Sequence, residues 1–265
     1  MRSPTPFAPE PGSPRLKRRR ESPHDTFWTV GAGGPDPVYG ERVLLRPDGV
    51  SLRLFEPGRS KLAAGLARGL AGPLPRPGER WLYLGAATGT TASHVADLVG
   101  PLGRVYAVEK SLRPFARLLA TARRYPNLCP ILGDARWTER HLGLIPPVAG
   151  VYADLAQPDQ VGIVLANCAE FLRPEGALLL ALKTASMGRD ATPEEHARAA
   201  HRQLAATFDL ADPIPLDPFH RRHFLLAGRA ARGPGASGSS GPPPVPRVPE
   251  RATSRPAGPR AGPRW

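Results

Sequence analysis

Between about residues 39 and 228 the chain alternates short apolar runs with longer amphipathic stretches. Apolar runs occur at 80–84, 104–108, 130–132, 148–153 and 177–182. Helical patterns of ten or more residues, such as 111–124 and 160–172, separate most of them. Short strands alternating with helices are typical of βαβ units, in which helices cover both faces of a parallel sheet. The pattern therefore predicts a doubly wound α/β domain.

Shorter signals flank this alternation. Residues 41–46 and 51–55 surround Pro47-Asp48-Gly49, which predicts a β-hairpin. Ser60 is placed to cap a helix that ends at Gly72-Pro73, and a final strand is expected at 223–227. We expect a disordered segment at 1–38, the hairpin at 39–58, the α/β domain at 59–229 and a disordered tail at 230–265.

Composition and charge support these boundaries. Pro, Arg, Ser and Gly dominate both ends, and the chain carries a formal net charge of +13. A basic cluster from Pro14 to Arg20 is expected to act as a nuclear import signal or a weak nucleic-acid contact. The excess of positive charge suits a polyanionic partner such as nucleic acid.

Other classes of protein are disfavoured by the sequence. The two cysteines, Cys129 and Cys168, form no Cys-x-x-Cys pair, so we expect no metal site. No run approaches the roughly 18 apolar residues that span a bilayer, so no membrane partner is expected. The first residues hold no apolar run typical of a secretory signal, and we expect an intracellular protein.

Candidate ligand-binding residues follow three of the predicted strands. The first strand runs into a loop of small residues, Gly85-Ala86-Ala87-Thr88-Gly89-Thr90-Thr91, the second ends at Glu109 and the third at Gly133-Asp134-Ala135. Ligands of doubly wound sheets bind at the carboxyl ends of the strands. A strand-end Glu can accept hydrogen bonds from ribose hydroxyls, and Asp134 could bind the exocyclic amine of adenine.

The spacing of the loop glycines separates two cofactor classes. The Gly-x-Gly-x-x-Gly pattern, which lets a backbone approach a pyrophosphate, is absent, and the glycines are spaced Gly-x-x-x-Gly instead. The loop, Glu109 and Asp134 together favour S-adenosylmethionine over a nicotinamide cofactor.

Several blocks of the sequence resemble the fibrillarin family. They are Tyr39-Gly40-Glu41, Arg59-Ser60-Lys61-Leu62-Ala63-Ala64, the run from Leu82 through Gly85 and Gly89 to Val95, Val105-Tyr106-Ala107-Val108-Glu109, and Asp154-Leu155-Ala156-Gln157-Pro158. The resemblance covers about residues 39–228. It implies a Rossmann-like, seven-stranded methyltransferase fold and an enzyme that transfers a methyl group from S-adenosylmethionine to ribose 2′-hydroxyls of RNA.

The resemblance also implies the site residues. The cofactor residues are expected to be Gly85, Ala87, Thr90, Thr91, Glu109, Lys110, Asp134, Ala135, Asp154, Leu155, Ala156 and Gln157. The catalytic Lys-Asp-Lys-His tetrad of the family falls on Lys61, Asp154, Lys183 and His223. We expect Lys183 to deprotonate or orient the hydroxyl, and Asp154 to position both the Lys183 amine and the sulfonium methyl by charge. Lys61 is expected to bind a phosphate or act on Lys183, and His223 to bind the substrate backbone or relay a proton.

The chain also departs from the family. Lys110 replaces an aromatic residue that stacks on adenine, and the part before Tyr39 is expected to be shortened. These changes leave a second interpretation open, a non-catalytic ribonucleoprotein component with an eroded cofactor site. A third keeps the enzyme and makes a histone glutamine the acceptor.

The partners follow from the resemblance alone. They are a box C/D guide RNA, the ribosomal RNA substrate, a Nop-type scaffold and the kink-turn-binding protein of the ribonucleoprotein. The chain would then act in the nucleus, in the nucleolus, on pre-ribosomal RNA, with tRNA processing as the alternative process. No base-reading module is evident, which agrees with site selection by a guide RNA.

Overall fold

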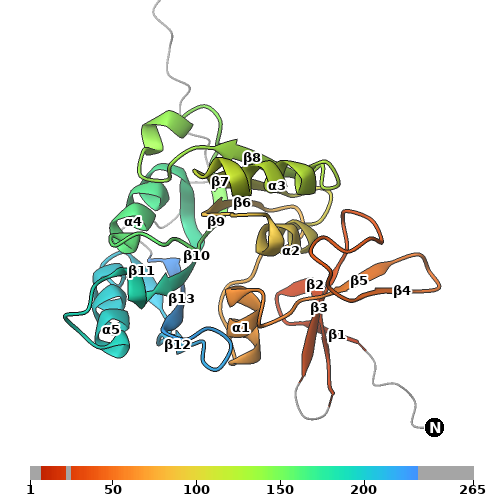
Figure 1. The fold of residues 1–265 in the computed structure, drawn as a ribbon, viewed down its shortest axis with the longest axis horizontal. Helices are drawn as coiled ribbons and strands as arrows, with labels where there is room; N and C mark the ends of the chain where they lie inside the picture. Colours follow the sequence, from red (N-terminus) through yellow and green to blue (C-terminus); the bar gives the residue numbers. More distant parts are fainter. Residues whose placement is uncertain (1–6, 22–24, 232–265) are drawn as a thin grey trace, which may run out of the picture. The chain divides into compact units, whose positions relative to one another are not determined.

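The computed structural model describes residues 7–21 and 25–231, drawn in colour in Figure 1. The tail predicted at 230–265 lies outside the described residues from position 232 onward. No helix in the described part is long and apolar enough to cross a membrane.

The site is positioned by the following strands: β6 (Arg80–Leu84), β7 (Arg104–Glu109), β8 (Leu128–Leu132), β9 (Val148–Ala153), β10 (Leu172–Lys183), β11 (Phe208–Leu210), β12 (Ile214–Pro215) and β13 (His223–Ala230). The helices are α1 (Lys61–Ala67), α2 (Thr90–Val99), α3 (Leu112–Ala122), α4 (Gln160–Phe171) and α5 (Pro193–Leu204). Two 3₁₀ turns, η1 (Thr138–His141) and η2 (Thr184–Ser186), complete the set.

The central sheet has the strand order β11-β13-β10-β9-β6-β7-β8, and the short β12 pairs with β13. Strands β10, β9, β6, β7 and β8 run parallel, whereas β13 is antiparallel to β10. Strand order reverses between β6 and β9, which places the ligand crevice at their carboxyl ends. The predicted doubly wound, mostly parallel fold is therefore confirmed.

Side chains of the central strands alternate between two cores. In β6, Trp81 and Tyr83 join the core beneath α1, α2 and α3, while Leu82 and Leu84 join the core beneath α4 and α5. Successive side chains of a strand point to opposite faces, so a strand covered on both sides becomes apolar throughout. This is why β6 and its neighbours read as continuous apolar runs in the sequence.

The N-terminal segment differs from the prediction. Residues expected to be disordered, together with the predicted hairpin, form a five-stranded antiparallel sheet ordered β1-β2-β3-β5-β4. Its strands are β1 (Ala8–Glu10), β2 (Ser13–Arg19), β3 (Thr26–Val30), β4 (Val43–Leu45) and β5 (Ser51–Leu54). The hairpin at β4 and β5 lies where it was predicted, but it is the edge of a larger sheet.

The basic cluster around Arg15–Arg19 therefore lies in β2, where the side chains pack. Leu16 and Trp28 are fully buried, and the Arg19 guanidinium lies over the Phe7 ring at 5.3 Å from its centre. Arg15 donates from Nη2 to the carbonyl of Val30 at 2.7 Å. Long cationic side chains can bury their aliphatic stems while their charged ends form hydrogen bonds. A segment rich in Lys and Arg can therefore be an ordered strand, although its composition predicted a disordered tail.

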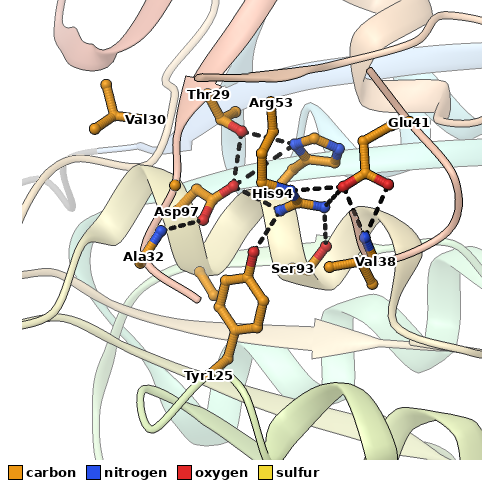
Figure 2. Close-up of polar contacts among 12 residues, drawn as sticks. Thr29, Val30, Ala32, Val38, Glu41, Arg53, Ser93, His94, Asp97 and Tyr125 are labelled. Atoms are coloured by element: carbon orange, nitrogen blue, oxygen red, sulfur yellow. Dashed lines mark hydrogen bonds and ion pairs between the residues drawn. The ribbon is translucent and has the colours of Figure 1, made fainter. Parts of the chain in front are cut away.

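A buried polar network joins the N-terminal sheet to α2 (Figure 2). The fully buried Arg53 of β5 donates to Glu41 Oε1 at 2.7 Å and to Asp97 Oδ2 of α2 at 2.7 Å. The same guanidinium donates to the hydroxyls of Tyr125 and Ser93 at 2.6 and 3.1 Å. These contacts fix α2, and with it the loop that precedes α2, against the sheet.

His94 belongs to the same network and is fully buried in α2. Its Nδ1 lies 2.8 Å from the Thr29 hydroxyl, its Nε2 lies 2.9 Å from the Tyr39 hydroxyl, and its ring stacks on Phe55. Burial, with a further contribution from Arg53, holds the pKa of His94 well below its ordinary value. His94 is therefore a neutral member of the network.

Candidate active site

A cavity of about 310 Å³ opens at the carboxyl ends of β6, β7, β8 and β9. Every predicted cofactor residue except Thr90 and Thr91 lines it. The lining consists of Gly85, Ala87, Val108, Glu109, Lys110, Ser111, Pro114, Gly133, Asp134, Ala135, Asp154, Leu155, Ala156, Gln157 and Ile163. It combines apolar walls with a few convergent polar groups, which is the usual character of a nucleoside site.

The floor of this cavity requires a glycine. Gly85 has a φ of +77°, and a Cβ at this position would lie 2.4 Å from the carbonyl oxygen of Asp154. Only glycine lets β6 turn so close to the end of β9. The carboxylate of Glu109, at the end of β7, accepts from the backbone amides of Ala87 at 2.9 Å and Ser111 at 2.7 Å. These two bonds fix the orientation of the carboxylate and leave lone pairs on both oxygens for a ribose.

The two groups expected near an adenine ring both carry charge. Asp134 accepts hydrogen bonds from the Arg136 guanidinium, the shortest at 2.7 Å, and these bonds hold its pKa below the ordinary value. Asp134 still faces the cavity, as does Lys110. Val108 and Ile163 supply apolar wall, so the residues present fit the nucleoside part of S-adenosylmethionine, with Lys110 in place of a stacking ring.

Thr90 and Thr91, the remaining predicted cofactor residues, begin α2 and do not line this cavity. Thr91 is buried, and its hydroxyl donates to the Ser60 hydroxyl at 3.0 Å. Ser60 in turn caps α1 by accepting from the amide of Ala63. The start of α2 is thus bonded to the start of α1, where Lys61 lies. A cofactor contact of either threonine stays a prediction.

The predicted catalytic residues gather at one edge of the sheet. Lys61, at the first turn of α1, donates to Asp154 Oδ2 at 2.7 Å, and both side chains keep about a fifth of their surface exposed. Asp154 follows β9 and also lines the cofactor cavity. The ion pair therefore lies where the cavity meets solvent.

Lys183 and His223 are directly opposite each other on β10 and β13. Nδ1 of His223 donates to the carbonyl of Arg221 at 2.8 Å, and Nε2 has no hydrogen-bond partner among the described residues. Burial lowers the pKa of His223, and the charge of Lys61 lowers it further while Asp154 opposes the change. Lys61 and Asp154 thus act electrostatically on His223, and Lys183 is the strand partner of His223.

Two residues that the sequence did not single out hold this cluster in place. Gln160, fully buried at the start of α4, accepts from the amide of Lys183 at 2.9 Å and donates to its carbonyl at 3.0 Å. His220 donates from Nε2 to the carbonyl of Pro57 at 2.8 Å and lies edge-on to His223. The His220-x-x-His223 spacing was the one available signal, and it is ambiguous without the hydrogen bonds and the ring contact that the structure shows.

The comparisons agree with this geometry. The family model for fibrillarin matches residues 20–232. The fibrillarin-like rRNA/tRNA 2′-O-methyltransferase of Aeropyrum pernix is 43% identical over 190 residues, which cover 71% of this chain and 81% of the relative.

Two solved structures are similar over most of their length. One is fibrillarin of Aeropyrum pernix with natively bound S-adenosyl-L-methionine, at a TM-score of 0.75 and 38% identity over 86% of this chain and 100% of that one. The other is a fibrillarin/Nop5p complex, at a TM-score of 0.71 and 37% identity over 78% and 94% of the two chains. The fold and its cavity are those of the S-adenosylmethionine-dependent methyltransferases. Within that class, the chain belongs to the fibrillarin family.

Proposed function

We propose that the chain is an S-adenosylmethionine-dependent RNA methyltransferase that methylates ribose 2′-hydroxyls. The observation that carries the proposal is the position of the Lys61–Asp154 ion pair at the mouth of the nucleoside-sized cavity, with Lys183 and His223 beside it on neighbouring strands. A cavity that binds the methyl donor and a basic cluster at its mouth are the two parts that such a reaction needs.

The cofactor supplies an electrophilic methyl group on a positively charged sulfur. Glu109 and Asp134 would hold its nucleoside, and Asp154 would place negative charge near the sulfonium. A ribose hydroxyl is a poor nucleophile, so a group at the cavity mouth has to take its proton or orient it. Lys183 is proposed for that step, because Gln160 fixes its backbone at the strand end.

Lys61 and His223 are proposed to hold the substrate. The hydrogen bond to Asp154 holds the Lys61 ammonium beside the reacting centre. At that position the ammonium can bind a phosphate group that lies next to the reacting ribose. His223 lies on the same edge, and its Nε2, which has no hydrogen-bond partner among the described residues, is the atom proposed to contact the substrate. Orienting the ribose for in-line attack removes much of the entropic cost of the reaction.

The partners proposed for the chain are a Nop-type scaffold, a box C/D guide RNA that selects the nucleotide, and the kink-turn-binding protein. The nucleolus is the proposed location and pre-ribosomal RNA the proposed substrate. The fibrillarin/Nop5p complex, with 94% of its fibrillarin chain covered, supports the scaffold. Transfer to a histone glutamine is the competing acceptor that a test has to include.

The proposal is tested by reconstitution. The full chain is combined with scaffold, kink-turn-binding protein, guide RNA and a complementary RNA, and product nucleosides are identified by mass spectrometry. We expect a 2′-O-methyl nucleotide at the guided position and no methylated glutamine on histone octamers. Methylated glutamine without methylated RNA would overturn the RNA acceptor. Absence of both products would favour a non-catalytic role in the ribonucleoprotein.

A further inference from the structure

A second cavity, of about 470 Å³, lies on the α3 side of the loop that precedes α2. Thr88 of that loop and Thr90, the first residue of α2, line it, whereas Gly85 and Ala87 of the loop line the cofactor cavity. Its full lining is Val38, Tyr39, Arg59, Thr88, Thr90, Arg117, Ala120, Thr121 and Arg124. We refer to it below as the arginine cavity.

Three arginines from two separate segments meet in the arginine cavity, and no acidic side chain is among its described lining residues. Arg59 precedes α1, Arg117 lies in α3, and Arg124 follows α3. None of the three forms an ion pair with any residue in the described part of the chain. Their positive charges are therefore concentrated in one concave surface.

Neutral groups hold two of these arginines in place. The Arg124 guanidinium donates to the carbonyl of Pro37 at 2.8 Å and to the carbonyl of Asp36. The Arg59 guanidinium lies over the Tyr39 ring, 5.4 Å from its centre. Carbonyls and an aromatic face orient a guanidinium without cancelling its charge, so the arginines remain available to an anion. The Thr88 and Thr90 hydroxyls of the lining, 3.5 Å from each other, add neutral hydrogen-bonding groups.

The charge continues along α3. Between Glu109 and Asp134 the sequence holds Lys110, Arg113, Arg117, Arg123 and Arg124 and no acidic residue. The sequence around α3 is therefore basic on balance, and Arg117 and Arg124 present this charge in the surface of the arginine cavity, whereas Arg113 lies outside it. Such surfaces bind the repeated charges of a nucleic-acid backbone, and binding to them weakens as salt rises.

The arginine cavity is also close in structure to the reacting groups. Arg59 is separated from Lys61 only by Ser60, whose hydroxyl accepts a hydrogen bond from Thr91 of α2. A chain seated in the arginine cavity would therefore pass beside the start of α1, where Lys61 meets Asp154. This places the arginine cavity on the approach of a strand to the reacting centre.

We propose that Arg59, Arg117 and Arg124 form a binding site for a phosphodiester group of the RNA strand that carries the target ribose. The proposal rests on the proposed RNA methyltransferase function and adds a specific substrate contact to it. Guanidinium groups match the geometry of phosphate oxygens, and phosphate contacts position a strand without reading its bases. The arginine cavity would thus fix the register of the strand while sequence choice is made elsewhere.

The test compares two arginines of the same helix. Arg117→Gln removes a charge from the arginine cavity, and Arg113→Gln removes the same charge from an exposed position outside it. Binding of the full chain to a fluorescent single-stranded oligouridylate is measured by anisotropy over a range of KCl concentrations. Single-stranded phosphate contacts each contribute about 0.7 to the slope of log affinity against log salt.

We expect Arg117→Gln to reduce that slope by about 0.7, the double variant Arg59→Gln/Arg117→Gln to reduce it by about 1.4, and Arg113→Gln to change it much less. Equal reductions by Arg117→Gln and Arg113→Gln would mean diffuse attraction and overturn the site. An undiminished slope in the double variant would overturn it too. Arginine-dependent binding of polyglutamate, with no such dependence for RNA, would assign the cavity to an acidic protein segment and overturn the RNA contact.

Two further readouts separate this inference from the proposed function. Calorimetric titration with S-adenosylmethionine is expected to be unchanged in Arg117→Gln, because Arg117 does not line the cofactor cavity. Guided methyl transfer is then measured at limiting RNA. Full transfer by the double variant would support the proposed methyltransferase function and overturn the proposed phosphodiester-binding site. If the slopes differ as expected but the natural chain transfers no methyl group, the RNA-binding site would be supported and the proposed methyltransferase function overturned.

Discussion

Two polar clusters of this molecule have similar compositions and different surroundings. The network around Arg53 is buried, and each charged group in it meets a partner from another element (Figure 2). The cluster around Lys61 and Asp154 is partly exposed, and its members keep free hydrogen-bonding capacity toward a cavity. Saturated polar groups hold elements together, whereas incompletely used ones can act on a ligand.

The two clusters are nevertheless connected through α2. Asp97 and Ser93 anchor this helix to Arg53, and Thr91 at its first turn bonds to Ser60 beside Lys61. Because the groups of the buried network are saturated, we expect changes there to lower the stability of the fold. Because the groups of the exposed cluster keep free hydrogen-bonding capacity, we expect changes there to lower the rate of the reaction. Variants in the two clusters therefore test whether stability and chemistry can be changed separately.

The largest effect is expected from Lys183→Met. Loss of a group that takes or orients the hydroxyl proton should lower guided methyl transfer by about 10²- to 10⁴-fold. The measurement is single-turnover transfer in the reconstituted ribonucleoprotein. Thermal unfolding and cofactor titration should change little, because Gln160 bonds only the backbone of Lys183. Transfer at the natural rate would remove Lys183 from the reaction.

Arg53→Met should have the largest effect on stability. It leaves the buried carboxylates of Glu41 and Asp97 without their cation, which costs about 3–5 kcal/mol in the free energy of unfolding. Urea unfolding of the full chain measures it. The matched control is Arg46→Met, which breaks an exposed pair with Asp48 and should cost about 0–1 kcal/mol. Similar costs in the two variants would show that the network does not hold the sheet to α2.

A smaller effect is expected from pH. The pKa of His94 is lowered in the folded protein, so the unfolded chain binds a proton first as the pH falls below about 6.5. Stability is then fully present above that pH and decreases below it, by at most about 1.4 kcal/mol per pH unit for one proton. His94→Gln should flatten the pH dependence of the unfolding free energy between about pH 5 and 7. An equally steep dependence in the variant would assign it to other groups.

The smallest effect is expected from Lys110→Phe. An aromatic face beside adenine adds about 0.5–1.5 kcal/mol beyond the area buried, which is roughly a two- to tenfold tighter Kd for S-adenosylmethionine. Calorimetric titration measures the change, and Lys110→Met is the control that removes the charge without adding a ring. Equal tightening by both variants would mean that the charge of Lys110, and not the missing ring, weakens the site.

The fold of the α/β domain could be predicted because its strands are buried on both faces. The run 148–153 and the run 80–84 lie where the pattern put them, and Ser60 caps α1 as expected. The N-terminal sheet could not be predicted in the same way. Its β2 strand alternates Leu16 with cations whose partners, such as Val30 and Phe7, come from other strands or from the chain end. The composition of the segment shows that it is rich in cations, but it does not show which distant residues these cations contact.

The candidate site was predictable in part for a similar reason. Glu109, Asp134 and Asp154 stand at the carboxyl ends of β7, β8 and β9, which are parallel strands of one sheet, so the sheet brings them to one edge whatever the loops do. Gln160 and His220 act through backbone groups of distant residues, and no local spacing marks such a contact. The arginine cavity needed the structure as well, because Arg59 is far from Arg117 in the sequence.

The central claim is that the cavity at the ends of β6, β7, β8 and β9 binds S-adenosylmethionine. Calorimetric titration of the cofactor into the full natural chain tests it most directly. We predict saturable binding at one site per chain with a micromolar Kd, weakened when Glu109→Gln removes the ribose-facing charge. No detectable binding by the natural chain would contradict the claim. Binding that appears only in Lys110→Phe would mean that this member of the family keeps the fold without the reaction.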